Sequence, residues 1–189
     1  MDYFGRWKAV HYQVKRSFEN VLLSVHKGNE TYKVHLINDD AMAYDGVIEV
    51  EIANFKGEVL WNKKVTHKAE TNSNTTPLIL TTGDLMGIDH NAVYLSMKFN
   101  SNDKHWQSTY FFEKPKDLKL TKPTIQVNII DDLTIEITSD VLAKNVFLSA
   151  EDSVFFSDNY FDLLPNEKKR IQLSKKVATL KIKSLFDTL

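Results

Sequence analysis

The stretch YFFEKPKDLKLTKP (residues 110–123) joins two parts of the sequence that share one pattern. Its aromatic beginning is typical of a half-buried β-strand, because ring side chains pack well on a pleated surface. Proline supplies no donor to a strand ladder and favours extended geometry in the preceding residue, so the strand is predicted to end near Lys114, before Pro115. Residues 115–123 are therefore predicted to be a short, stiff, extended linker that holds two domains side by side.

Before this linker, residues 20–114 alternate apolar and polar positions in short runs, with turn residues about every ten positions. In the clearest run, Ile48, Val50 and Ile52 are predicted to face one way while the two intervening glutamates face the other. Segment 70–76 contains Asn, Ser and Thr without an apolar anchor, so it is predicted to be a loop before a short strand at 77–80. This pattern is typical of a β-sandwich.

After the linker, residues 124–189 repeat the same alternation on a smaller scale, around turns at Asp131-Asp132 and Pro165-Asn166-Glu167. Residues 155–164 are aromatic and irregular. The segment is predicted to be a second, smaller sandwich. Because so short a module buries little of its surface, we expect a thin margin of stability.

Residues 1–19 show a helical period instead. Spacings of three and four define an apolar stripe of Phe4, Trp7, His11, Val14 and Phe18. The stripe is widened by Tyr3 and Val10. Asp2 is a candidate N-cap, and two basic residues suit the C-terminal end of the helix dipole. The helix is expected either to pack on the first sandwich or, because its stripe is so aromatic, to face a larger partner, pair with a second copy or fray.

The bulk composition excludes several classes of function. A net charge of -1 and a pI near 6.6 lack the basic surface that nucleic-acid and anionic-membrane partners require. The chain has no cysteine, so it has no disulfide, thiolate nucleophile or cysteine metal site. We expect no nucleic-acid partner and no membrane partner. The first residues are already patterned as folded structure, so the chain is expected to begin inside a longer protein.

The residues that most often carry enzyme chemistry are scattered. The six histidines, none of them four residues from another, are His11, His26, His35, His67, His90 and His105. Adjacent carboxylates occur at Asp39-Asp40, Asp131-Asp132 and Glu151-Asp152, but neighbours in an exposed turn point apart, whereas glycoside hydrolysis needs two carboxylates converging across a sugar. We predict no catalytic residue, no metal site and no cofactor.

Two tryptophans invite a carbohydrate hypothesis. Trp61 and Trp106 lie on or near strands of the first module, where a flat ring could stack on a sugar face. The competing interpretation is packing, because tryptophan has the largest apolar surface to bury. They are the candidate sugar-stacking residues.

Several strings resemble one family of enzymes. The opening DYFGRWKAVHYQVKR resembles the end of the catalytic barrel of family 2 glycoside hydrolases, in particular the β-mannosidases. The linker stretch resembles the junction between the two β-sandwich domains that follow that barrel, and TSDVLAKNVFLS and FFSDNYFDLLPNEKKRIQL resemble the terminal immunoglobulin-like domain. Asn166 stands where the family usually has glycine, and asparagine tolerates the left-handed geometry such a turn needs.

The resemblance implies an all-β chain of two tandem immunoglobulin-like β-sandwich domains preceded by one N-terminal α-helix. Residues 1–19 would be a helix from the end of the missing barrel, residues 20–114 the first domain, residues 115–123 the linker and residues 124–189 the second domain. The family's catalytic glutamates lie upstream, in the barrel. The acid/base follows an asparagine there, but Asn29-Glu30 and Asn166-Glu167 lie in turns of β-modules, so neither is assigned that role.

The resemblance implies that this chain is a non-catalytic portion that supports the barrel of an enzyme hydrolysing terminal, non-reducing β-mannosides with retention. The barrel is then its expected partner, with glycan and self-association through the helix as further expectations. A carbohydrate-binding module and the tail of an exo-β-glucosaminidase are the alternatives. The sequence leaves the compartment open, although a periplasmic or extracellular parent enzyme is compatible with it.

Overall fold

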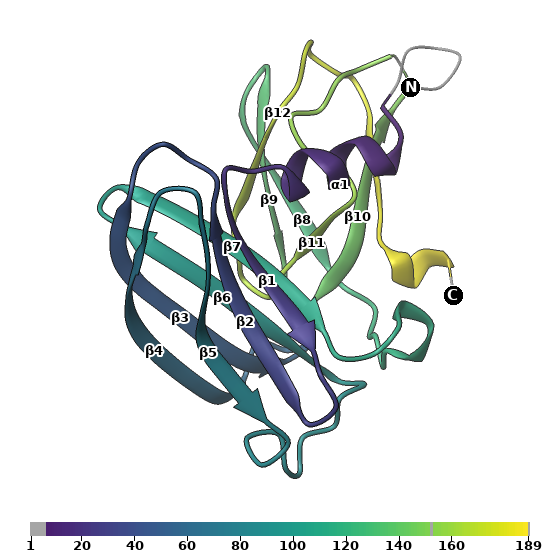
Figure 1. Cartoon of the computed structure of the whole chain (residues 1–189). Coiled ribbons are helices and arrows are strands. Elements are labelled where there is room, and N and C mark those ends of the chain that lie inside the picture. The colour runs from purple at the N-terminus through teal and green to yellow at the C-terminus, as the bar shows by residue number, and fades with distance from the viewer. Residues whose placement is uncertain (1–6, 152, 189) are drawn as a thin grey trace. The chain divides into compact units, whose positions relative to one another are not determined.

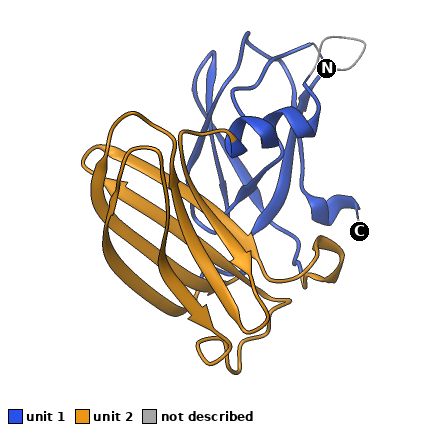
Figure 2. Ribbon diagram, in the orientation of Figure 1, with its two compact units in different colours: residues 1–17, 55–57, 120–189 blue, residues 18–54, 58–119 orange. Residues whose placement is uncertain are grey.

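A computed structural model describes residues 7–151 and 153–188, and the chain divides into two compact units (Figures 1 and 2). Among the described residues, unit 1 comprises 7–17, 55–57, 120–151 and 153–188, and unit 2 comprises 18–54 and 58–119. Strands dominate both units, and one α-helix lies at the beginning of the described chain. The predicted fold class, all-β with tandem sandwiches after a helix, is confirmed.

Unit 2 is a sandwich of two antiparallel sheets. Its strands are β1 (Val21–Lys27), β2 (Thr31–Asn38), β3 (Tyr44–Asn54), β4 (Val59–Ala69), β5 (Ser73–Thr81), β6 (Val93–Ser101) and β7 (Lys104–Phe111). One sheet has the order β1-β2-β5 and the other β4-β3-β6-β7. Ile48, Val50 and Ile52 on β3 are all fully buried, as their alternation predicts. The core around them also includes Phe99 and Leu95 of β6.

The polar segment 70–76 departs from its prediction. Its second half is not a loop, because β5 begins at Ser73 and pairs with β2 through Asn38↔Ser73, Ile37↔Asn74 and Leu36↔Thr75. Backbone hydrogen bonds to β2 hold these residues in a strand although their side chains lack apolar groups. A prediction from side-chain pattern alone cannot detect a strand of this kind.

The start of the predicted linker is folded. Instead of an extended connector, Pro115–Asp117 forms a short 3-10 turn, η1. The loop at Asn91 holds it, because the Asn91 side-chain amide donates to the carbonyl of Asp117 at 2.7 Å and the Lys119 backbone N–H donates to the carbonyl of Asn91 at 2.8 Å. Leu118 between these contacts is buried. The first half of the connector is therefore part of unit 2.

Unit 1 contains two small antiparallel sheets. Its elements are α1 (Ala9–Ser17), β8 (Ile125–Asp131), β9 (Thr134–Ser139), β10 (Ala143–Ala150), β11 (Phe161–Leu163), β12 (Lys169–Gln172), β13 (Leu180–Lys183) and the 3-10 turn η2 (Leu185–Thr188). The sheets have the orders β12-β9-β8 and β11-β10-β13. Ile137, Val146, Leu163 and Ile171 are fully buried in a core separate from that of unit 2. Asn166 has a φ of 60°, which confirms the left-handed turn.

Helix α1 belongs to unit 1, where it packs against residues 155–160. The residue that it buries is Tyr12, which lies outside the predicted stripe. Two stripe members, Val14 and Phe18, are 46% and 81% exposed, so the described chain leaves this part of the stripe uncovered, and its pairing with a larger partner or a second copy stays a prediction. The candidate cap Asp2, together with Tyr3 and Phe4, lies outside the described residues.

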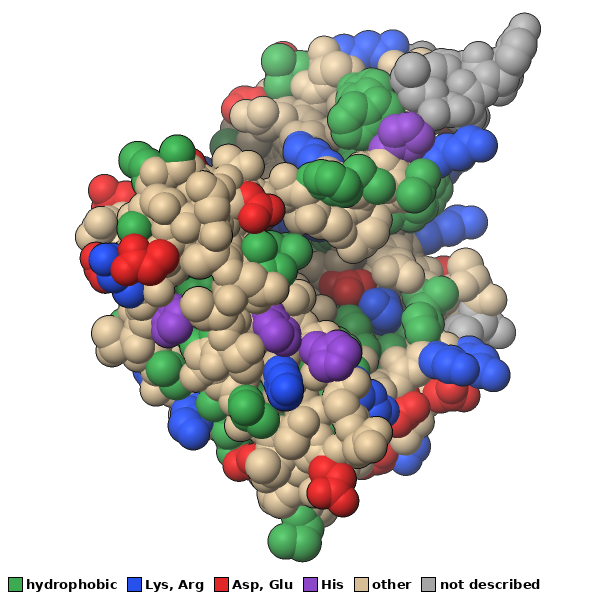
Figure 3. Space-filling model, in the orientation of Figure 1, with side chains coloured by type: hydrophobic (Ala, Val, Ile, Leu, Met, Phe, Trp, Pro, Cys, Tyr) green, Lys and Arg blue, Asp and Glu red, His purple; other side chains and the backbone are tan. Residues whose placement is uncertain are grey.

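Two features of the described chain bear on its surroundings. No helix in residues 7–151 or 153–188 has the length and apolar character needed to cross a membrane. On the face drawn in Figure 3, basic and acidic side chains are interspersed over the surface, in keeping with a net charge near zero.

Candidate functional site

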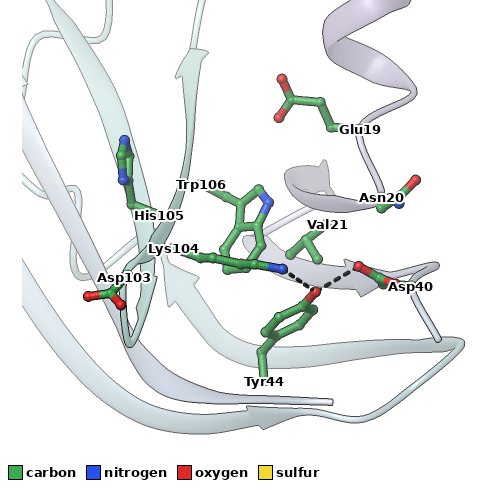
Figure 4. Close-up of a pocket in the computed structure, with 9 residues that line it drawn as sticks. All are labelled: Glu19, Asn20, Val21, Asp40, Tyr44, Asp103, Lys104, His105 and Trp106. Atoms are coloured by element: carbon green, nitrogen blue, oxygen red, sulfur yellow. Dashed lines mark hydrogen bonds between the residues drawn. The ribbon is translucent and has the colours of Figure 1, made fainter. Parts of the chain in front are cut away.

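Unit 2 contains an open hollow of about 460 Å³ at one end of the sandwich (Figure 4). Its walls come from three places: the entry into β1, the turn before β3 and the turn between β6 and β7. Six of the side chains that line it are Glu19, Asn20, Val21, Asp40, Tyr44 and Trp106. The hollow therefore brings together residues that lie up to 87 positions apart in the sequence.

The floor of the hollow is aromatic. The Trp106 ring stacks on the fully buried Phe99 ring, with centroids 5.6 Å apart and an interplanar angle of 20°. Tyr44 meets the same tryptophan edge-on, with centroids 4.9 Å apart. Such stacked and edge-on contacts fix ring orientation in addition to burying area. Trp106 is thus held in one orientation at the edge of the core.

A chain of hydrogen bonds crosses the hollow beside this floor. The Lys104 ammonium donates to the Tyr44 hydroxyl oxygen at 2.9 Å, and the Tyr44 hydroxyl donates to the Asp40 carboxylate at 2.6 Å (Figure 4). The hydrogen bond from Tyr44 lowers the pKa of Asp40, and the nearby Lys104 acts in the same direction. The bond to Tyr44 also raises the pKa of Lys104. Both ends of the chain therefore stay charged at neutral pH.

Replacing Tyr44 by phenylalanine is expected to raise the pKa of Asp40 toward its ordinary value, because the largest cause of its lowered pKa is lost. In the native protein this lowered pKa stabilises the fold above the unfolded value of about 3.9, and the stabilisation is lost as the pH falls through the folded pKa. Carboxyl chemical shifts followed through an acid titration would measure the change.

Asp84 is the internal control in the same titration. Its pKa is lowered by hydrogen bonds from the backbone N–H and hydroxyl of Thr81, outside the hollow. The Tyr44→Phe variant should leave Asp84 unchanged. An Asp40 titration identical in both proteins would contradict the assigned hydrogen bond.

The carboxylates around the hollow do not converge on one point. In Figure 4, Asp103 points away from the Tyr44 hydroxyl and lies on the opposite side of it from Asp40, and Glu19 is separate from both. Retaining hydrolysis needs two carboxyl groups about 5 Å apart on either side of the scissile bond. Among the described residues, no group of three or more His, Asp or Glu side chains is arranged to hold a metal ion.

The two predicted stacking residues lie apart. Trp61 pairs with Ile52 on one edge strand, β4, whereas Trp106 pairs with Phe99 on the other edge strand, β7. Phe99 in turn pairs with Ile48 of β3, so Trp106 is level with Ile48 whereas Trp61 is level with Ile52, four residues further along the same strand. Across the sheet, the two edge strands β4 and β7 are separated by three strand spacings. With about 3.3 Å per residue and about 4.8 Å per strand, this separation is roughly 19 Å. They cannot form one stacking surface.

Their surroundings also differ. Trp61 packs against the core of unit 2 and does not line the hollow, whereas Trp106 does both. Sequence reasoning missed Tyr44, Lys104 and Asp40. Lys104 and Tyr44 are sixty residues apart, and each looks like an ordinary strand end in its own segment. No local pattern signals that they meet.

A second hollow, of about 500 Å³, lies within unit 1 between α1 on one side and β10 with the residues that follow it on the other. Its walls include aromatic rings from both sides, among them Trp7 and Phe155, whose centroids are 5.0 Å apart. Tyr12 and Tyr160 line it as well, with centroids 6.1 Å apart. These contacts attach the start of the described chain to the second module.

Two protein-family models match the chain in sequence. Residues 30–117 match a mannosidase Ig/CBM-like domain, and residues 120–188 match an Ig-fold domain of the mannosidase type. The two matches meet where the compact units divide, between residues 119 and 120. No curated protein matches the chain significantly.

Solved structures resemble the chain over almost its whole length. A β-D-mannosidase from Dictyoglomus thermophilum is 23% identical with a TM-score of 0.82, over 97% of this chain and 24% of that one. An exo-chitosanase from Amycolatopsis orientalis is 13% identical with a TM-score of 0.68, over 96% of this chain and 27% of that one. The chain therefore spans about a quarter of the length of these structures.

Proposed function

We propose that this chain, whose residues 30–117 and 120–188 match mannosidase Ig/CBM-like and Ig-fold domains, is the non-catalytic C-terminal portion of a β-mannosidase-like exo-glycosidase. Its two modules are accessory domains of the glycosidase type. The parent enzyme would hydrolyse terminal, non-reducing β-D-mannose residues by a retaining mechanism. The catalytic carboxylates would belong to a barrel domain outside this chain.

The observation that carries the non-catalytic assignment is the arrangement of carboxylates around the hollow of unit 2. Asp40 already accepts hydrogen bonds from the Tyr44 hydroxyl and the Ala41 backbone N–H, and Asp103 points away from it. An acid/base and a nucleophile need to face one bond from two sides. The described residues around this hollow offer no such pair.

The work of the modules is structural support of the barrel. Within unit 1, Arg16 of α1 forms an ion pair with Asp158 and donates to the carbonyl oxygens of Asn159 and Tyr160. A domain joined to the chain ahead of α1 would thereby be attached to the second module as well as to the peptide that follows the helix. This double attachment would restrict the orientation of that domain.

The purified chain is expected to release no p-nitrophenol from p-nitrophenyl β-mannoside above the buffer rate. The result follows from the lack of a facing carboxylate pair in the described residues. A characterised β-mannosidase is the positive control, and p-nitrophenyl β-glucosaminide is the second substrate. Turnover that survives further purification and scales with the concentration of this chain would overturn the non-catalytic assignment.

A second candidate parent is an exo-β-glucosaminidase, favoured by the similarity to the exo-chitosanase. Both parents would use this portion in the same way, so the residues of this chain do not separate them. The gene sequence ahead of Asp2 is the decisive observation, because the pocket that selects the sugar would be encoded there. An open reading frame without a barrel upstream would contradict both parents.

A further inference from the structure

We propose that the hollow of unit 2 is a glycan subsite that takes one pyranose ring without an acidic group, stacked against Trp106. The choice of a glycan as the ligand rests on the proposed function, because a glycosidase accessory domain works in the presence of sugar chains. The geometry of the hollow supplies the remaining steps. The subsite is independent of any catalytic step.

Trp106 has the two properties that a stacking platform needs. Phe99 supports its ring from the core, and Tyr44 fixes its tilt, so little conformational entropy is lost when a ligand binds. The ring is also partly exposed and lines the hollow. A pyranose presents apolar C–H groups on its faces, and burying them on an aromatic ring provides the affinity that hydroxyl groups alone cannot.

Free polar groups surround the platform. The described residues provide no hydrogen-bond partner for the Trp106 indole N–H or for the Glu19 carboxylate, and both border the hollow in Figure 4. Lys104 uses one of its three donors on Tyr44. Sugar hydroxyls both donate and accept, so they can satisfy the carboxylate as well as the indole and ammonium donors.

The charges of the lining select against acidic sugars. Two carboxylates, on Glu19 and Asp40, face the hollow beside the single ammonium of Lys104. A uronic acid would add a like charge to this excess, which is unfavourable at short range. Neutral hexoses and amino sugars share the ring that the hollow needs, and they differ only in charge. Mannobiose and the glucosamine disaccharide are therefore the two probes.

Titration of the ¹⁵N-labelled chain with β-1,4-mannobiose, followed by NMR, is expected to shift the Trp106 indole N–H signal with a Kd of about 1 mM, a weak affinity suited to a single ring. The glucosamine disaccharide serves as the second arm. A shift with either supports the subsite, and the tighter of the two identifies the sugar. Digalacturonic acid is the anionic control and should produce no shift.

Variants locate the binding. Trp106→Ala is expected to weaken binding at least tenfold, and Glu19→Gln, which leaves the aromatic packing intact, about threefold. Trp61→Ala is the matched control, because this tryptophan packs on the same core away from the hollow. Asp103→Asn is the polar control, because its side chain points away. Both controls should keep the native Kd.

Several results would overturn the subsite. The proposal is wrong if neither mannobiose nor the glucosamine disaccharide shifts any signal. It is also wrong if the shifts caused by these probes persist unchanged in Trp106→Ala and Glu19→Gln. If Trp106→Ala fails to fold, the Glu19→Gln comparison still decides the location. These failures leave the non-catalytic assignment untouched, because that assignment is decided by the p-nitrophenyl β-mannoside assay.

Discussion

Replacing Gly46 by alanine is expected to lower the free energy of unfolding of unit 2 by about 3 kcal/mol. A Cβ atom at this position would lie 2.2 Å from the carbonyl oxygen of Asn100 and 2.8 Å from the Phe99 ring. The first of these is backbone of the paired strand β6, held by the ladder at Val47↔Asn100, so it cannot move aside as a side chain would. Urea unfolding followed by tryptophan fluorescence would measure the loss.

Gly83→Ala is the matched control for this experiment. A Cβ atom there would meet only the Thr81 hydroxyl, at 3.4 Å, which is an ordinary contact. The control should change the free energy of unfolding by less than about 0.5 kcal/mol. Equal stability of the two variants would contradict the close approach of β3 and β6. Because Phe99 also supports Trp106, the Gly46→Ala variant should in addition shift the Trp106 indole signal.

Replacing Arg16 by alanine is expected to release α1 from the second module and to cost about 2 kcal/mol. The guanidinium forms an ion pair with Asp158 and donates to the carbonyl oxygens of Asn159 and Tyr160, so its loss removes three charge-assisted contacts at once. Faster amide hydrogen exchange throughout Ala9–Ser17, with unit 2 unchanged, would report the release.

Two further variants define the role of Arg16. Arg170→Ala removes a mostly exposed arginine whose partner is Glu136, and it should cost less than about 1 kcal/mol. Arg16→Lys keeps the charge but cannot make the same set of planar contacts, so its cost in stability should lie between those of Arg16→Ala and Arg170→Ala. Native exchange rates in the helix of Arg16→Ala would show that Tyr12 and Trp7 suffice to hold it.

The sequence correctly predicts the structural features that depend on residues close together along the chain. Alternation correctly assigned the buried face of β3, with Ile48, Val50 and Ile52, and turn chemistry correctly assigned the left-handed Asn166. These successes share one cause. A strand's inward face and a turn's backbone angles depend on residues within a few positions, so they are visible without knowledge of the fold.

The features that could not be predicted from the sequence depend on contacts between residues far apart along the chain. Strand β5 begins at Ser73 because β2 supplies its ladder, and α1 buries Tyr12 because its partner surface comes from residues 155–160. The hollow of unit 2 has the same origin, since Lys104 reaches Tyr44 only once the turns before β3 and β7 lie together. Trp106 was singled out for its ring alone, and the groups around it became evident only in three dimensions.

The attachment of α1 to residues near position 158 sets an order of events during synthesis. A ribosome delivers the helix first and the residues that receive Arg16 about 140 residues later. The whole of unit 2 emerges in between, and its core contains no residue of α1, so it can fold while the helix still lacks its binding surface. Until residues 155–160 have been synthesised, Tyr12 and Trp7 lack the surface against which they pack, and a nascent chain stalled in that interval is expected to bind chaperones.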